Sequence, residues 1–214
     1  MAGRSIPYLL AAAAGLAQAA AIASPWDGQP QWWLQLISLA VLAGLLQRCG
    51  RALQGVALGW TFALAWLTAT YWWLYISMHV YGGLPALLAA LAVLALAAFL
   101  GSYYALAAGL FVRLRFTGSA VAALLFGALW LLAELMRATW FTGFPWGAGG
   151  YAHPDGPLRF LAPLVGVYGI GFVAALLAYG LSLLARKAYA RSWAYWGCVA
   201  AANQRGPSVT TTYR

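Results

Sequence analysis

The chain has 214 residues, of which 64% are hydrophobic and 7% are charged, and its formal net charge is +9. Soluble domains contain about 25% charged residues, so this composition excludes a water-soluble globular protein. The basic residues lie in short clusters between long apolar runs, as topology signals of membrane proteins do, and they therefore do not indicate nucleic-acid binding.

Apolar runs of bilayer length predict an all-α fold, a polytopic transmembrane helical bundle of about six to seven spans. The first run ends in Ala21-Ile22-Ala23, which resembles a signal-peptide cleavage site, but its length favours a helix that is retained. The expected spans are 6–23, 32–47, 53–76, 85–112, 119–136 and 160–184, within a transmembrane domain of residues 1–192. Residues 193–214 are expected to form a partial seventh span and a polar tail, as in a truncated chain.

The distribution of basic residues predicts the orientation of these spans. With the N-terminus inside, the inner segments hold Arg4, Arg48, Arg51, Arg113, Arg115, Arg186, Lys187 and Arg191. The outer segments hold Arg137 and Arg159 together with Asp27 and Asp155. Because basic residues concentrate in cytoplasmic loops, we expect a cytoplasmic N-terminus and a periplasmic loop at residues 137–159.

This loop, called the Gly/Pro loop below, interrupts the helical pattern most strongly. Its glycines and Pro145 prevent a helix from continuing, and aromatic residues surround them. The candidate lipid-binding or substrate-binding residues here are Trp140, Phe144, Pro145, Trp146 and Tyr151. Aromatic residues anchor proteins at the membrane interface, but backbone this irregular must be buried or line a cavity. We therefore expect the loop to shape an opening for a lipid chain.

Glu134 and Arg137 are candidates for contact with a lipid headgroup. They lie one helical turn apart, so they share a helix face. One interpretation is a simple ion pair, and the other is a polar site in which Arg137 binds phosphate through two hydrogen bonds. Tyr168, flanked by Gly166 and Gly169, is a further candidate, although close helix packing explains these glycines better.

The remaining reactive side chains do not form a catalytic or metal-binding pattern. We expect His79 and His153 to be isolated surface or interfacial histidines. Cys49 and Cys198 lie beside or within apolar runs and are interpreted as packing residues, without a base nearby in the sequence. We therefore assign no catalytic residue, no metal and no cofactor.

An ordered series of motifs resembles the membrane domain of bacterial apolipoprotein N-acyltransferases over residues 53–184. The series consists of Tyr71-Trp72-Trp73, Tyr81-Gly82-Gly83-Leu84-Pro85, Trp130, Glu134, Arg137, Thr142-Gly143-Phe144-Pro145-Trp146, Gly150-Tyr151, Leu161-Ala162-Pro163 and Gly166-Val167-Tyr168-Gly169. The resemblance implies an inner-membrane protein of lipoprotein maturation. In this family an acyl chain passes from a phospholipid, through a cysteine thioester, to the N-terminal lipidated cysteine of a lipoprotein.

The same resemblance implies that the catalytic Glu, Lys and Cys lie in a nitrilase-like periplasmic domain, which this chain does not contain. We therefore expect the chain alone to be inactive. The alternative is a non-enzymatic protein, either a membrane transporter or a lipid-binding scaffold. Transporters commonly carry charges within their spans, and the centres of the expected spans have none.

Overall fold

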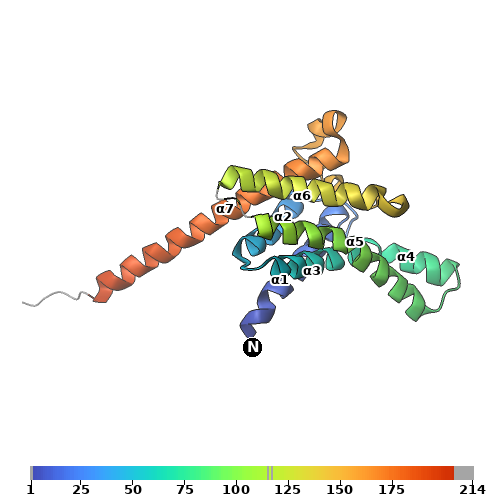
Figure 1. The fold of residues 1–214 in the computed structure, drawn as a ribbon, viewed down its shortest axis with the longest axis horizontal. Helices are drawn as coiled ribbons and strands as arrows, with labels where there is room; N and C mark the ends of the chain where they lie inside the picture. Colours follow the sequence, from blue (N-terminus) through green and yellow to red (C-terminus); the bar gives the residue numbers. More distant parts are fainter. Residues whose placement is uncertain (1, 115, 117, 205–214) are drawn as a thin grey trace, which may run out of the picture. The chain divides into compact units, whose positions relative to one another are not determined.

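The computed structural model describes residues 2–114, 116 and 118–204, with side chains described within residues 5–188. All regular elements within these residues are helices, which confirms the predicted all-α fold (Figure 1). The chain divides into two units, Met1–Ser182 and Leu183–Arg214. The first unit holds the helical bundle described below.

The helices follow the expected apolar runs closely. They are α1 (Ala2–Ile22), α2 (Trp32–Arg48), α3 (Ala52–Thr70), α4 (Trp72–Ile76), the π-helix η1 (Ser77–Tyr81), α5 (Ala86–Leu114), α6 (Ser119–Thr139), the 3₁₀ turns η2 (Trp140–Thr142), η3 (Gly149–Ala152) and η4 (Arg159–Leu161), and α7 (Ala162–Gln204). Five helices are long and apolar enough to cross a membrane, and α2 is a shorter apolar helix of 17 residues. Large apolar side chains, such as Leu87 and Leu106 of α5, are exposed along them. The chain is thus a multi-pass membrane protein.

Small residues allow α3 to pack closely against both α1 and α5 (Figure 1). The backbone of α1 approaches α3 so closely at Gly15 that a side chain there would collide with the Phe62 carbonyl oxygen. On the α5 side, a methyl group on Gly59 would lie 2.5 Å from the Ala108 Cβ and 2.9 Å from the Tyr104 carbonyl oxygen. Apolar tails of lipid compete with apolar side chains, so such close backbone packing is a main source of helix association in membranes.

An aromatic cluster forms the centre of the bundle. The rings of Trp66 from α3 and Trp130 from α6 stack with centroids 5.5 Å apart. Tyr104 from α5 packs against both rings, and Phe62 packs edge-on against Trp130. Offset and edge-on pairs of this kind contribute about 0.5–1.5 kcal/mol each beyond the burial of their surface.

The expected third span, 53–76, needs one correction, because the helix ends at Thr70 and the chain turns at Tyr71. Tyr71, at this turn, is fully buried, and its hydroxyl accepts a hydrogen bond from Arg137 of α6. At the other end of the chain, α7 is helical from Ala162 to Gln204 apart from a break at Gly166, where φ is 65°. The domain boundary at residue 192 and the seventh span remain predictions.

Replacing Gly59 with alanine tests the close packing of α3 on α5. The added methyl group would overpack this contact, at a cost of about 1–3 kcal/mol. We expect the apparent unfolding temperature of the detergent-solubilised protein to fall by about 3–10 °C. Gly44→Ala is the matched control, because a methyl group on Gly44 of α2 would meet nothing within 4 Å. Equal unfolding temperatures for Gly59→Ala and Gly44→Ala would contradict the packing described here.

Candidate functional site beneath the Gly/Pro loop

Arg137 lies in the last turn of α6 with its side chain completely buried. Its Nε donates a hydrogen bond to the Tyr104 hydroxyl oxygen at 2.9 Å. Its Nη1, which carries two hydrogens, lies 2.9 Å from the Tyr71 hydroxyl, 2.9 Å from the Phe144 carbonyl and 2.6 Å from the Trp146 carbonyl. The guanidinium also lies over the Trp66 ring, 5.8 Å from its centroid. Arg137 therefore joins α3 and α5 to the backbone of the Gly/Pro loop.

Glu134, one turn earlier, holds the far side of the same loop. Its side chain is fully buried, and its Oε1 accepts a hydrogen bond from the Gly149 backbone N–H at 2.9 Å. Within the described part of the chain, Glu134 and Arg137 form no ion pair within 4.0 Å, so the first interpretation of their spacing was wrong. The two charges instead bind different segments of the loop.

A second buried link joins the loop to α2. Gln35 is fully buried, and its Nε2 donates a hydrogen bond to the Gly149 carbonyl at 2.7 Å. The Gln35 Oε1 therefore faces the His153 Nε2, 2.7 Å away, and accepts a hydrogen bond from the Nε2–H group. Gly149 must lack a side chain, because a methyl group there would lie 2.6 Å from the Gln35 Nε2.

The expectation that His153 is an isolated surface or interfacial residue was wrong, since 1% of it is exposed and its ring contacts Gln35. The hydrogen bond to Gln35 keeps the proton on Nε2 and leaves Nδ1 without a partner among the described residues. Burial disfavours the charged imidazolium and lowers the pKa of His153 from 6.5 to about 4. His153 is therefore neutral at physiological pH. His79 is half-buried, with one ring nitrogen 2.7 Å from the Leu84 carbonyl oxygen.

The backbone of the loop is held in conformations that most residues avoid. Phe141 and Thr142 have positive φ angles of 52° and 73°, and Gly143 follows with a φ of 75°. A side chain on Gly143 would also collide with the Ala138 carbonyl oxygen. Positive φ at residues other than glycine costs about 1–3 kcal/mol each, so the surrounding contacts must impose this turn. The contacts around the turn include the backbone hydrogen bonds of the Gly143 and Phe144 N–H groups to the Trp140 and Arg137 carbonyls. The Arg137 side chain adds hydrogen bonds to the Phe144 and Trp146 carbonyls.

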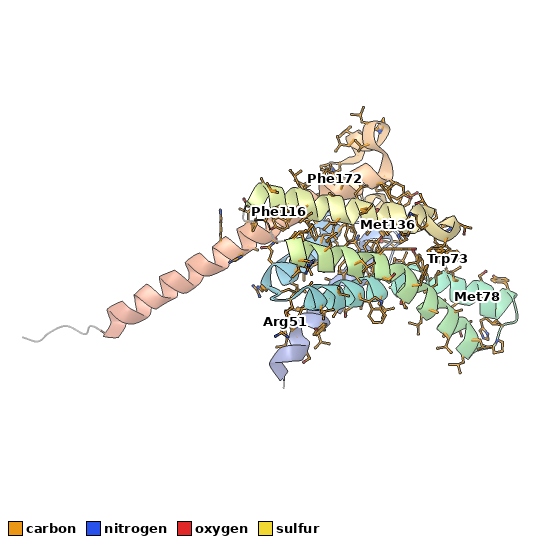
Figure 2. The ribbon with its side chains drawn as sticks, viewed as in Figure 1. Arg51, Trp73, Met78, Phe116, Met136 and Phe172 are labelled. Carbon is orange, nitrogen blue, oxygen red and sulfur yellow. The ribbon has the colours of Figure 1, made fainter. Side chains whose placement is uncertain are left out.

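The aromatic candidate residues of the Gly/Pro loop differ in their exposure. Trp140, Trp146 and Tyr151 are exposed, at 54%, 60% and 54%, and Pro145 is also exposed. Phe144 is half-buried against Tyr71, with ring centroids 4.9 Å apart. The Trp146 ring contacts Trp73 of α4 edge-on at 6.0 Å, and Figure 2 labels Trp73 at this end of the bundle.

Tyr168 of α7 is half-buried, and no hydrogen bond is found for its hydroxyl among the contacts of the described residues. The structure thus brings Glu134, Arg137, Phe144 and Trp146 together around one turn of α6. It also places Trp140 against Tyr103 of α5, with ring centroids 6.2 Å apart.

Sequence reasoning missed four polar contributors to this site, namely Gln18, Gln35, Tyr71 and Tyr104. Each is buried, and each lies in a segment that precedes the Gly/Pro loop by more than 30 residues in the sequence. A signal was present for the two glutamines, because each is an amide inside an apolar run, and polar groups within spans need partners. In the described residues, no three His, Cys, Asp or Glu side chains gather as metal ligands would.

Comparisons with known proteins match most of the chain. Residues 14–180 match the family described as apolipoprotein N-acyltransferase N-terminal domain. An apolipoprotein N-acyltransferase of Verminephrobacter eiseniae is 63% identical over 195 residues, which cover 89% of this chain and 36% of that protein. The corresponding protein of Ralstonia nicotianae is 53% identical over 150 residues (69% of this chain, 29% of that protein). The corresponding protein of Pseudomonas putida is 45% identical over 173 residues, which cover 79% of this chain and 33% of that protein. The chain spans about a third of the length of these curated relatives.

The buried histidine predicts a dependence of stability on pH. Below pH 6.5 the unfolded chain protonates His153, whereas the folded protein does not do so until about pH 4. Protonation therefore favours the unfolded state, and stability should fall as the pH decreases from 6.5 towards 4. Apparent unfolding temperatures measured from pH 7.5 to pH 5 should show this loss.

The matched variants are His153→Gln and His79→Gln. The first should flatten the pH dependence between pH 7.5 and pH 5, because it removes the titrating group, and the second should retain it. A wild-type slope in His153→Gln would mean that another group is responsible for the pH dependence.

Proposed function

Because this chain belongs to the apolipoprotein N-acyltransferase family, we propose that it forms the membrane domain of an enzyme that acylates lipoproteins. The match of residues 14–180 to the N-terminal domain of that family carries the proposal. The acyl donor in the proposed reaction is a membrane phospholipid. The acceptor is the α-amino group of the lipidated N-terminal cysteine of a lipoprotein. The family match favours this function over a transporter or a scaffold.

The role proposed for the Gly/Pro loop is to guide a lipid chain towards the catalytic part of the enzyme. Its exposed aromatic side chains, Trp140, Trp146 and Tyr151, form an apolar rim that suits acyl chains. Phe144 and Pro145 fix the turn between them, since proline restricts its own φ and that of the preceding residue. Tyr168 is proposed as a further lipid contact on α7.

Glu134 and Arg137 support this rim from below. The Arg137 guanidinium is completely buried and binds two carbonyls of the loop, so we propose that it positions the loop in the resting protein. Contact between Arg137 and a lipid phosphate would require the loop to move away. The Arg137 Nη2, which has no hydrogen-bond partner among the described residues, would then be available to the phosphate.

We propose that this chain does not perform the transfer by itself. A thioester mechanism needs a reactive thiolate, and burial keeps a thiol protonated unless a base or a cation lies beside it. Cys49 is buried at the end of α2, and its thiol donates to the Leu45 carbonyl oxygen at 3.5 Å. The side chain of Cys198 lies outside the described residues. The nucleophile is therefore proposed to belong to the nitrilase-like domain of the family.

We also propose that the protein lies in the bacterial inner membrane with its N-terminus in the cytoplasm and the Gly/Pro loop in the periplasm. The support is the concentration of basic residues in alternate segments of the sequence.

The proposed function is tested with this chain joined to the catalytic part of a family relative. Trp146→Ala should reduce formation of the acyl-enzyme, because one aromatic contact with the lipid chain is lost. The loss of such a contact is worth about 1–3 kcal/mol, which corresponds to about a 5- to 150-fold decrease. Arg137→Ala should also reduce the rate, and Arg137→Lys should restore it only in part, because lysine lacks the planar fork.

The measurement is acyl-enzyme formation as a function of phospholipid concentration, normalised to folded protein. The chain without the catalytic part is the negative control and should form no acyl-enzyme. If Trp146→Ala and Arg137→Ala both match the wild type at every concentration, the loop is only an interfacial anchor.

The proposed orientation is tested by cysteine labelling in intact cells. In a background without Cys49 and Cys198, Asp155→Cys should react with a membrane-impermeant thiol reagent. Arg51→Cys should react only after the cells are opened. Labelling of Arg51→Cys from outside would reverse the proposed orientation.

A further inference from the structure

Helix α7 passes α6 at Gly171, which is buried although no steric contact requires a glycine there. A methyl group on Gly171 would lie 3.4 Å from the Glu134 Oε2, 3.7 Å from the Trp130 Nε1 and 3.8 Å from the Gly150 backbone nitrogen. These are ordinary van der Waals distances, and Gly171 does not have a positive φ. Alanine would also favour the helix more than glycine does. A small space beside the Gly171 Cα therefore has three polar atoms as its nearest neighbours.

Two of these polar atoms lack a hydrogen bond within the described part of the chain. They are the Glu134 Oε2, an acceptor, and the Trp130 Nε1, which can only donate. Glu134 is completely buried, and 4% of Trp130 is exposed. Buried polar atoms are nearly always paired with protein or with ordered water, because an unpaired group loses its hydration without compensation.

We infer that one buried water molecule occupies the space beside Gly171 and bridges Glu134 to Trp130. The occupant must accept a hydrogen bond from the indole N–H and donate one to the carboxylate, which a water molecule does. An anion would be repelled by the carboxylate, and a cation could not accept a hydrogen bond from the indole N–H. The occupant must also be small, because the position of one methyl group already lies within 3.4–3.8 Å of all three polar atoms.

Further buried polar atoms lie around the other oxygen of the Glu134 carboxylate. Gln18 of α1 is fully buried, and neither atom of its amide has a partner among the described contacts. Its Nε2 lies 3.5 Å from the position that a methyl group on Gly149 would take, and the Glu134 Oε1 lies 3.3 Å from the same position. Internal waters occupy sites of this kind, where two to four polar groups converge.

The water would complete the connection of Glu134 to its surroundings. The Oε1 already holds the Gly/Pro loop through Gly149, and the water would join the Oε2 to Trp130 beside α7. The water would also explain why position 171 holds a glycine, because a side chain there would displace the water. This inference does not depend on the proposed acyl transfer.

Gly171→Ala and Gly180→Ala provide a matched test on the same helix. A methyl group on Gly180 would meet nothing within 4 Å, so Gly180→Ala should leave the apparent unfolding temperature unchanged or raise it. Gly171→Ala should lower it by about 2–6 °C, because the methyl group would expel the water and leave two buried polar atoms unpaired. If Gly171→Ala is as stable as Gly180→Ala, the inference is wrong.

A density map of the wild-type protein, at a resolution that shows internal waters, tests the site directly. We expect one peak within about 3.2 Å of both the Glu134 Oε2 and the Trp130 Nε1. A map that shows other internal waters but no peak here would overturn the inference, whether or not Gly171→Ala folds. Direct pairing of the two atoms with other protein groups would overturn it equally.

Discussion

The architecture at this end of the bundle depends on the burial of one guanidinium group. An unpaired charge within an apolar bundle is costly, so Arg137 can be buried only where several oxygen atoms surround it. The hydroxyls of Tyr71, at the turn after α3, and of Tyr104 in α5 supply two of these oxygens, and the backbone of the Gly/Pro loop supplies the others. The helix packing and the loop conformation are therefore linked, because each contributes ligands to the same group.

Glu134 and Arg137 divide the loop between them rather than neutralising each other. Arg137 binds the carbonyls of Phe144 and Trp146, and Glu134 binds the amide of Gly149. A positive group thus meets carbonyl oxygens and a negative group meets an N–H, so each charge pairs with the complementary end of a peptide dipole. One turn of a single helix thus holds the segment from Phe144 to Gly149, directly after the strained turn. These hydrogen bonds hold the backbone of the loop that carries the exposed ring of Trp146.

The fold was predictable from the sequence because apolar runs of bilayer length leave few alternatives to a helical bundle. The break between α6 and α7 at the Gly/Pro loop was also predictable, since glycines and a proline interrupt the apolar pattern there. The partners were not predictable. Tyr71 and Gln35 lie 66 and 114 residues from the groups that they bind, and no local pattern reports such contacts. His153 was misjudged for the same reason, because its burial is caused by Gln35 on a distant helix.

The positions of these partners along the chain also order the steps of biosynthesis. Tyr71 and Tyr104 precede α6, so acceptors for Arg137 have already been synthesised when α6 leaves the ribosome. Gly149, which binds Glu134, is synthesised 15 residues after it. Two of the four acceptors of Arg137 therefore precede α6 in synthesis, whereas its two loop carbonyls and the Gly149 amide that binds Glu134 follow it. Closure of the loop over α6 therefore requires groups that are synthesised after α6, up to residue 149.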